Sequence, residues 1–375
     1  MKKICFVVTA EFAVKVFLLN HIRGLSEFYD ITVIVNTNNP NFLAELDINA
    51  KVIPLAIDRD INLISDFVSL IKLIRIFHQQ RFSAIQSITP KAGLLAMLAA
   101  SLLGVPLRVH AFTGQVWATK KGLKRFFLKQ LDCLIASLTT YNIVDSPSQR
   151  QFLIDEKVVS CSKSIVFAKG SVSGVDAARF KPNSEAKIAI KRQLNIPTDA
   201  IIFLFLGRLT RDKGVLDLAN GFNSINTDGA HLLFVGPDEQ NMQVEIEHIT
   251  ESCSGYVHFI GHTDVPESYM AATDVLCLPS YREGFGTVVI EAAAAGIPAI
   301  ASRIYGLTDA VVEGKTGLLH EPHNVNAIKN CMEQMMSNKV MRLKFGEQAR
   351  VRAVKEFDSK VITQEWLNFY HKNIH

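Results

Sequence analysis

Residues 275–295 read VLCLPSYREGFGTVVIEAAAA, and this stretch decides the fold. A short apolar strand ends at Pro279, a glycine-containing loop follows, and an alanine-rich segment from Thr287 has the composition of a helix. A buried strand that leads directly into a helix is typical of α/β proteins with parallel sheets. Glycines 284 and 286 let an anion approach backbone amides at the start of that helix. The stretch therefore predicts a turn that binds a diphosphate.

The same alternation of short apolar runs and helix-period segments continues along the chain in two series. Loop-forming residues between 171 and 183, including Gly174 and Pro182, separate the series and indicate a linker. The predicted strands cover residues 3–9, 31–36, 51–54, 84–87, 107–111, 142–144 and 164–167, and then 201–207, 231–236, 257–260, 275–279, 298–301 and 317–319.

These series predict an α/β protein with two doubly wound, parallel-sheet (Rossmann-like) domains that face a central cleft. We place the first domain at residues 1–175 and the second at 183–360. Aromatic residues at helical spacing predict a final helix over 361–375 that packs back towards the first domain. Open α/β sheets bind ligands at the carboxyl ends of their strands, so functional residues are expected there.

The composition of the 375-residue chain excludes several classes of protein. With 48% hydrophobic residues it is too apolar for a disordered chain. The longest uncharged apolar run, 93–106, is shorter than the roughly 20 residues that a membrane-spanning helix needs. The six cysteines form no CxxC pair, which favours free thiols in a reducing cytosol over a zinc site.

Charge is distributed unevenly along the chain. Residues 1–200 carry 25 Lys and Arg against 15 Asp and Glu (+10), and residues 201–375 carry 15 against 21 (−6), which together give +4. This asymmetry predicts different partners for the two halves. No recognised nucleic-acid-binding motif accompanies the basic half, so we expect no nucleic-acid partner.

Charged residues are predicted at the same edge of the second sheet as the glycine loop. Arg208 follows Gly207 at the end of the first strand of the second series, and Lys213 precedes the next helix. Both cations can reach one diphosphate, Arg208 through a forked contact and Lys213 as a point charge. Carboxylates beside a phosphate are suited to accept hydrogen bonds from hydroxyl groups. Glu283 and Glu291, eight residues apart, therefore predict recognition of a sugar and a ribose.

These motifs resemble the donor half of the retaining, GT-B-fold glycosyltransferases of family 4. The resemblance rests on Gly207-Arg208, Lys213-Gly214 and the Glu283–Glu291 spacing, and in the first domain on residues 89–93 (TPKAG) and 108–117 (RVHAFTGQVW). It covers nearly the whole chain. It is closest to bacterial enzymes that extend sugars on undecaprenyl-diphosphate lipids during O-antigen, capsule or N-glycan assembly.

The resemblance implies a role for each matching residue. Arg208 and Lys213 neutralise the donor diphosphate, while Glu283 accepts a hydrogen bond from a hydroxyl group of the donor sugar. Glu291 accepts hydrogen bonds from the ribose hydroxyls, and backbone groups near Gly261 and His262 recognise the nucleotide base. The donor-binding set is completed by Gly207, Gly284, Phe285, Gly286 and Thr287, the last four through backbone amides. Since cations and amides stabilise the leaving group, the resemblance implies a UDP-sugar donor with no metal and no other cofactor.

A competing metal-binding pattern occurs at Asp58-Arg59-Asp60. This DxD triplet is the signature of the other main glycosyltransferase fold, but a suitable nucleotide-binding strand order does not surround it. We therefore interpret it as a solvated turn or a helix cap.

The first domain departs from the family pattern. Residues 9–14 contain no glycine, although the family often has a glycine-rich loop after the first strand. Thr113 occupies the place of the family's usual histidine, and His110 lies three residues earlier. Either residue could line the sugar pocket, and His110 is equally well explained as a hydrogen-bonded histidine at a strand end. Lys91 could contact an acceptor phosphate or be an ordinary residue of a helix start.

Residues 120–129 (KKGLKRFFLK) combine five basic residues with Phe126 and Phe127. This pattern favours a surface helix on anionic lipid over a solvated basic face. Residues 61–77 form a second apolar helix with Lys72 and Arg75 on its narrow polar side, and we expect it to pack against the sheet.

The sequence therefore predicts a retaining glycosyltransferase at the inner face of the plasma membrane. It would move an N-acetylhexosamine or deoxy sugar from a UDP-sugar to an undecaprenyl-diphosphate-linked saccharide. Two alternatives stay open: a UDP-sugar epimerase or hydrolase of the same fold, and a non-catalytic protein that binds nucleotide sugars.

Overall fold

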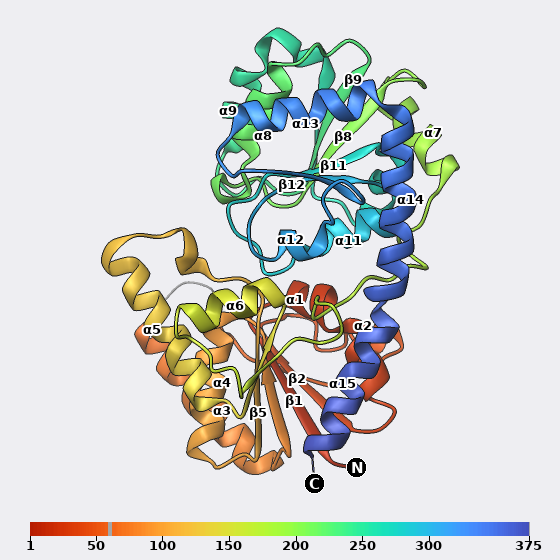
Figure 1. Cartoon of the computed structure of the whole chain (residues 1–375). Helices are drawn as coiled ribbons and strands as arrows, with labels where there is room; N and C mark the ends of the chain where they lie inside the picture. The colour runs from red at the N-terminus through yellow and green to blue at the C-terminus, as the bar shows by residue number, and fades with distance from the viewer. Residues whose placement is uncertain (59–61, 375) are drawn as a thin grey trace. The chain divides into compact units, whose positions relative to one another are not determined.

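The computed structural model describes residues 1–58 and 62–374, and the chain divides into two compact units (Figure 1). Unit 1 contains Met1–Gly174 and the residues from Ser359 onward, and unit 2 contains Val175–Asp358. The chain therefore leaves unit 1 after residue 174 and returns to it at 359, where the sequence analysis placed these divisions at 175–183 and 360–361. Each unit is built around one parallel sheet.

The unit 1 sheet has the strand order β3-β2-β1-β4-β5-β6-β7. These strands are β1 (Lys3–Val8), β2 (Asp30–Val35), β3 (Lys51–Pro54), β4 (Ala84–Ser87), β5 (Leu107–Phe112), β6 (Tyr141–Val144) and β7 (Ser164–Ile165). Successive residues of β1 face opposite sides: Ile4 and Phe6 belong to one core cluster, and Cys5 and Val7 to another. Burial on both faces explains why these strands are almost continuously apolar.

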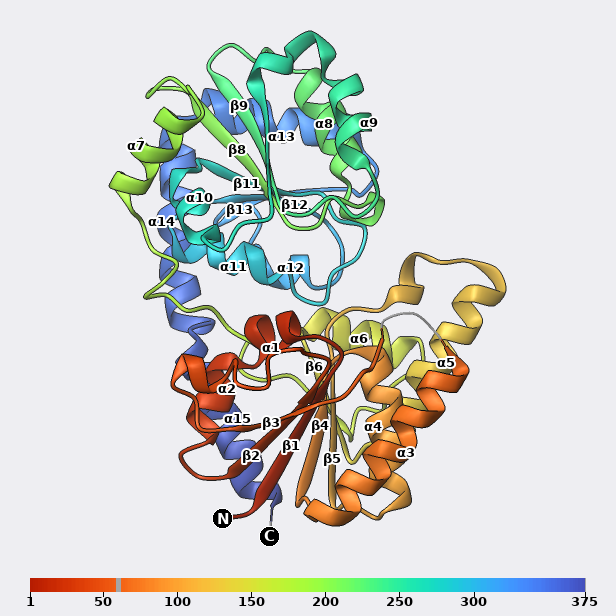
Figure 2. The ribbon, with the colours of Figure 1, turned by 180° about the vertical axis from the view of Figure 1, so that it is seen from behind.

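Helices cover both faces of this sheet (Figures 1 and 2). On one face α4 (Pro90–Leu102) packs between α3 (Leu63–Gln80) and α5 (Gly122–Leu138). The other face carries α1 (Glu11–Phe17), α2 (Leu19–Leu25) and α15 (Ser359–Asn373). The unit also contains α6 (Pro147–Asp155) and the 3₁₀ turns η1 (Ala44–Leu46) and η2 (Val116–Thr119).

The C-terminal helix α15 is part of the unit 1 core. Trp366 is 1% exposed, and its Nε1 donates a 3.1 Å hydrogen bond to the carbonyl oxygen of Val172. Tyr370 is fully buried and its hydroxyl donates to Oε1 of Gln86 in β4. The aromatic spacing seen in the sequence therefore marks the face of α15 that packs on the first sheet.

The unit 2 sheet has the order β10-β9-β8-β11-β12-β13. Its strands are β8 (Ile201–Leu206), β9 (Ala230–Val235), β10 (Val257–Gly261), β11 (Val275–Leu278), β12 (Ala299–Ser302) and β13 (Gly317–His320). Its helices are α7 (Ser184–Gln193), α8 (Val215–Asn223), α9 (Met242–Ile249), α10 (Pro266–Ala272), α11 (Thr287–Ala294), α12 (Leu307–Ala310), α13 (Val325–Ser337) and α14 (Lys339–Glu356), with 3₁₀ turns η3 (Arg211–Lys213) and η4 (Glu251–Tyr256). Every predicted strand is confirmed, with ends shifted by at most two residues.

Helix α3 differs from the sequence prediction. Its inner face packs on the sheet through Leu73 and Phe77, but Leu63, Ile64 and Phe67 of its first turns are exposed. The expectation of a core helix was therefore wrong for the first half of α3, because apolar residues occur on its outer face as well. Of the DxD triplet, Arg59 and Asp60 lie outside the described residues. Within the described ranges, every helix falls short of the length and apolar character needed to cross a bilayer.

Candidate active site

The loop of residues 279–286 lies at the carboxyl edge of the unit 2 sheet, between β11 and α11. Gly286 precedes α11 with a φ of 81°, a left-handed conformation that glycine adopts without strain. Gly306 packs so closely against this loop that a Cβ at residue 306 would lie 2.4 Å from the carbonyl oxygen of Gly284. Close backbone packing thus fixes the loop at the start of α11, where helices present unpaired amides to anions.

Lys213 and Glu283 form an ion pair at this loop. The Nζ of Lys213 lies 2.5 Å from Oε1 of Glu283, and the two side chains are only 20% and 14% exposed. The hydroxyl of Ser280 donates a 2.8 Å hydrogen bond to the same carboxylate oxygen. A Cβ on Gly214 would lie 2.1 Å from the carbonyl oxygen of Pro279, so the turn that carries Lys213 packs directly on the loop. The structure therefore places Lys213 and Glu283, which the sequence predicted at the same edge of the sheet, in direct contact.

Arg208 lies two residues after β8, at the same edge of the sheet. Its Nη1 is 2.7 Å from Oε2 of Glu239, in the loop that follows β9. Both side chains are about one third exposed, at 35% and 37%. Sequence reasoning missed Glu239, since it belongs to no recognised motif. Arg208 and Lys213, the two cations predicted at this edge, are therefore each paired with a carboxylate.

Asp212 joins η3 to the glycine loop. It lies 2.7 Å from Arg282 and accepts a 2.6 Å hydrogen bond from the hydroxyl of Thr210. Burial opposes ionisation of Asp212, but the Thr210 hydroxyl and the Arg282 and Lys213 cations hold its pKa below the usual value. The carboxylate thus stays charged and holds Arg282 of the loop in an ion pair. Sequence reasoning missed this pair as well.

Glu291 lies in α11, one residue beyond the first turn. Burial raises the pKa of Glu291 to about 7, although nearby Arg179 lowers it and Glu267 raises it further. Arg179 and Glu267 are themselves paired at 2.8 Å. The ionised carboxylate is the form of Glu291 best suited to accept hydrogen bonds from hydroxyl groups.

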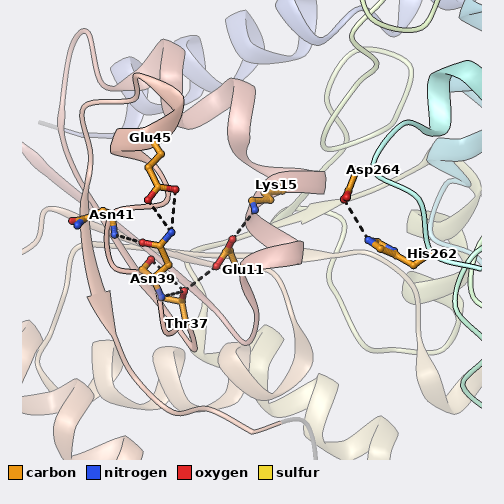
Figure 3. Close-up of polar contacts among 8 residues, drawn as sticks. All are labelled: Glu11, Lys15, Thr37, Asn39, Asn41, Glu45, His262 and Asp264. Carbon is orange, nitrogen blue, oxygen red and sulfur yellow. Dashed lines mark hydrogen bonds and ion pairs between the residues drawn. The ribbon is translucent and has the colours of Figure 1, made fainter.

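The predicted base-reading residues Gly261 and His262 end β10 and begin the next loop. Nε2 of His262 lies 3.4 Å from Oδ1 of Asp264, and the two side chains are 64% and 97% exposed (Figure 3). The predicted donor residue Phe285 is 0% exposed and packs against Phe357 at 5.1 Å between ring centroids. Its side chain therefore anchors the loop, and only its backbone is suited to contact a ligand.

His110 lies inside unit 1. It is 1% exposed, its Nδ1 is 2.8 Å from the Ser87 hydroxyl, and burial lowers its pKa to about 3. A Cβ on Gly93 would lie 2.5 Å from the His110 ring, so the glycine of the TPKAG segment makes room for this histidine. The structure thus supports the packing interpretation of His110. Thr113, which follows β5 at the carboxyl edge, is partly exposed.

Lys91 lies in the first turn of α4, and its Nζ is 2.6 Å from Oδ1 of Asp66 in α3. Its side chain is 13% exposed. Lys91 therefore joins two helices at the carboxyl edge of the unit 1 sheet, where β4 ends. Nothing in the sequence pattern pointed to Asp66 as its partner.

A polar network lies at the same edge of unit 1, next to β1 (Figure 3). Glu11 accepts a 2.9 Å hydrogen bond from the Thr37 hydroxyl and pairs with Lys15 at 2.6 Å, which holds the pKa of Glu11 below its usual value. The amide of Asn39 donates to both carboxylate oxygens of Glu45 at 3.1 Å. Helix α1 begins three residues after β1, so a short helix occupies the place of the glycine-rich loop.

The donor-half residues therefore gather at one edge of unit 2, and the first-domain residues Thr113 and Lys91 lie at the corresponding edge of unit 1. In the described residues, His, Cys, Asp and Glu form no group of three or more that could hold a metal ion.

Comparison with known proteins identifies the family. The model for glycosyl transferases group 1 matches residues 186–352, and the glycosyl transferase 4-like model matches residues 3–142. The capsular polysaccharide biosynthesis glycosyltransferase CapM of Staphylococcus aureus is 32% identical over 326 residues, which cover 86% of this chain and 84% of CapM. The UDP-Gal:alpha-D-GlcNAc-diphosphoundecaprenol alpha-1,3-galactosyltransferase of Escherichia coli is 26% identical over 328 residues, covering 85% and 83% of the two chains.

Solved structures agree in fold. HepE of Anabaena, in complex with UDP and glucose, superimposes with a TM-score of 0.84 at 18% identity, covering 99% of this chain and 100% of HepE. Sucrose-phosphate synthase of Thermosynechococcus elongatus gives a TM-score of 0.83 at 22% identity, covering 99% of both chains. The predicted GT-B architecture of two Rossmann-like units is thus confirmed, and the chain belongs to the group 1, family 4-like glycosyltransferases.

Proposed function

We propose that this protein transfers a sugar from a UDP-sugar to an undecaprenyl-diphosphate-linked saccharide during assembly of a surface polysaccharide. The observation that carries the proposal is the Lys213–Glu283 ion pair at the glycine loop of unit 2, with Arg208 at the carboxyl end of the neighbouring strand β8. The Escherichia coli relative named above is described as acting on a diphosphoundecaprenol-linked sugar. A Campylobacter jejuni relative, 25% identical over 315 residues and covering 80% of each chain, is named N,N'-diacetylbacillosaminyl-diphospho-undecaprenol alpha-1,3-N-acetylgalactosaminyltransferase.

The donor diphosphate is proposed to bind both cations, which carboxylates now balance. Arg208 exchanges Glu239 for a phosphate, and Lys213 shares its charge between a phosphate and Glu283. Amides of the 284–287 turn complete the anion site. Glu283 then accepts a hydrogen bond from a hydroxyl group of the donor sugar, and Glu291 accepts hydrogen bonds from the ribose hydroxyls. These fixed cations and amides support departure of the diphosphate, so we propose a metal-independent reaction.

The proposed reaction keeps the anomeric configuration. The bond between the sugar C1 and the diphosphate oxygen breaks, and its electron pair leaves with UDP. An acceptor hydroxyl oxygen bonds to C1 from the same face and gives its proton to the departing phosphate. Lys213 contributes most, because its side chain is less exposed than that of Arg208, 20% against 35%, and its charge is therefore less screened by water.

The donor sugar is proposed to be an N-acetylhexosamine or a deoxy sugar. Thr113 and Lys91, at the carboxyl edge of the unit 1 sheet, are proposed to face the acceptor, Lys91 through the acceptor phosphate. The protein would work at the cytoplasmic face of the membrane, where its lipid-linked acceptor and its soluble donor are both available.

The decisive experiment is a transfer assay with a panel of UDP-sugars and a short-chain polyprenyl-diphosphate saccharide, read by mass spectrometry. One donor is expected to add a single sugar to the acceptor. Rapid loss of donor without acceptor would instead indicate an epimerase or a hydrolase, and binding of UDP with no turnover of any donor would indicate a non-catalytic protein. Lys213→Ala and Glu283→Ala, checked for folding by circular dichroism, are expected to lose transfer.

A further inference from the structure

The first turns of α3 expose an unusually apolar face. Leu63 and Ile64 are 81% and 80% exposed, Phe67 is 62% exposed, and Val68 and Ile71 are 45% and 47% exposed. Single exposed apolar residues are common on soluble proteins, but a continuous group of this size marks an interaction surface. The face cannot be explained by packing on the sheet, because α3 uses its opposite face for that purpose.

Helix α5 exposes a second apolar face. Leu123, Phe126 and Phe127 are 75%, 55% and 63% exposed, and Leu131 and Leu134 continue the stripe at 36% and 40%. The spacing of three and four residues places these side chains along one side of the helix. The rings of Phe126 and Phe127 lie 5.7 Å apart, edge to face.

Both apolar faces begin at the same edge of unit 1. Helices α3 and α5 each follow a strand of one parallel sheet, so each starts at the carboxyl edge of that sheet. Helix α4 contacts both α3 and α5, and the three helices lie on the same face of the sheet (Figures 1 and 2). Lys91 of α4 holds Asp66 of α3 by an ion pair, which neutralises the acidic residue of the first turn of α3.

The basic residues of segment 120–129 fall into two groups, one paired within the protein and one without ion pairs among the described residues. Arg125 and Lys129 lie 2.7 and 2.6 Å from Glu156 and lean over the ring of Trp117, so they are used within the protein. Within the described part of the chain, Lys120, Lys121 and Lys124 form no ion pair, and Lys121 and Lys124 are exposed. Three lysines beside exposed Phe and Leu side chains match a bilayer interface, with anionic headgroups above acyl chains.

We propose that α3 and α5 together form a two-helix membrane-docking surface, with Leu63, Ile64 and Phe67 of α3 as an apolar anchor that enters an anionic bilayer. Lys120, Lys121 and Lys124, at the start of α5, bind the headgroups, and Phe126 and Phe127 enter beside them. The choice of partner rests on the proposed function, since a lipid-linked acceptor requires the carboxyl edge of unit 1 to reach a membrane. Binding to the bilayer itself needs neither donor nor acceptor, so it can be tested alone.

The test is sedimentation of the purified chain with vesicles of phosphatidylcholine containing 30% phosphatidylglycerol. The variant Leu63→Gln/Ile64→Gln/Phe67→Gln is expected to bind at least tenfold more weakly than the wild type. A matched control changes three equally exposed apolar residues of α14 in unit 2, Val340→Gln/Leu343→Gln/Val351→Gln, which are 78%, 63% and 64% exposed, and should bind as the wild type does. Lys120→Glu/Lys121→Glu/Lys124→Glu should remove the preference for anionic over pure phosphatidylcholine vesicles.

Undiminished binding by the α3 variant would overturn the proposal, and so would a wild type that binds neither kind of vesicle. If the wild type instead forms a dimer that the α3 variant abolishes, the face is an interface between copies and the proposal fails. Sugar transfer to a short-chain, water-soluble acceptor should be equal in the wild type and the α3 variant. This last measurement separates loss of docking from failure of the proposed enzymatic function.

Discussion

The ammonium of Lys213 and the carboxylate of Glu283 lie 2.5 Å apart, although 70 residues separate them in the chain. The turn before α8 supplies the cation and the loop before α11 supplies the carboxylate. A donor diphosphate that enters this edge adds negative charge next to the lysine, so the pair must share the cation with the phosphate. Lys213 is therefore the residue on which we expect the chemistry to depend most.

Replacement of Lys213 by alanine is expected to lower kcat by roughly 100-fold or more, in the range seen when a group that stabilises a leaving charge is removed. Glu283 is then left without its cation in a mostly buried site, so UDP affinity should also fall. Steady-state kinetics and calorimetric titration with UDP measure the two effects. The control is Lys329→Ala in α13, where Lys329 forms a longer ion pair, 3.7 Å, with Glu333. A Lys213 variant no slower than this control would contradict the assigned role.

Glu239→Gln should strengthen UDP binding by about 1.4- to fivefold. Arg208 must leave Glu239 to meet a phosphate, and a partly exposed ion pair of this kind is worth about 0.2–1 kcal/mol. Glu245→Gln makes the same change in the pair with Arg211, which is more exposed. It should leave the dissociation constant for UDP unchanged. Weaker binding by Glu239→Gln would mean that Glu239 positions Arg208 rather than competing for it.

Gly306→Ala is expected to destabilise unit 2 and weaken UDP binding together. The new Cβ would lie 2.4 Å from the carbonyl oxygen of Gly284, at a φ of +82°, so the glycine loop must move. Gly229→Ala has a similar φ of +72° but open space around the Cβ, and it isolates the backbone strain of about 1–2 kcal/mol. Urea unfolding and UDP titration of both variants check this. Equal effects in the two would show that the contact with Gly284 is unimportant.

The pH dependence of donor binding should follow Glu291. Its pKa is raised to about 7, so the carboxylate forms only as the pH rises through that value. UDP affinity is therefore expected to increase between pH 6 and 8, and Glu291→Gln should lose this increase.

Stability should change in the opposite direction. Because the folded-state pKa of Glu291 is above its unfolded value, folding binds a proton between about pH 4.5 and 7. The contribution of Glu291 is thus present below pH 4.5 and is lost as the pH rises towards 7. Urea unfolding from pH 4.5 to 8 should show that the free energy of unfolding of the wild type falls relative to that of Glu291→Gln. If the two proteins show the same dependence on pH, folding does not raise the pKa of Glu291.

The sequence was sufficient to predict the strands and the position of the glycine loop between β11 and α11. Buried parallel strands must be apolar on both faces, so the runs around β1 and β8 could be recognised directly. The glycine loop after β11 and the cations after β8 follow from the rule that ligands bind at the carboxyl ends of such strands. The family resemblance added the roles that the pattern alone left open.

Pairings between distant side chains could not be read from the sequence. No spacing relates Arg208 to Glu239, or Arg125 to Glu156, since each pair is made by packing of separate elements. The exposed face of α3 was missed for a related reason. A helix that is apolar on most sides looks buried by periodicity, and only its neighbours decide which side meets solvent.

The arrangement of α15 also has a consequence for biosynthesis. Unit 2 is formed by one uninterrupted segment of the chain. Trp366 and Tyr370, which belong to the core of unit 1, lie in a segment that follows unit 2. A ribosome therefore finishes all of unit 2 before the aromatic side chains that seal the earlier-made sheet emerge. During that interval the α2 side of the nascent first unit lacks the apolar side chains of α15 that cover it in the folded protein.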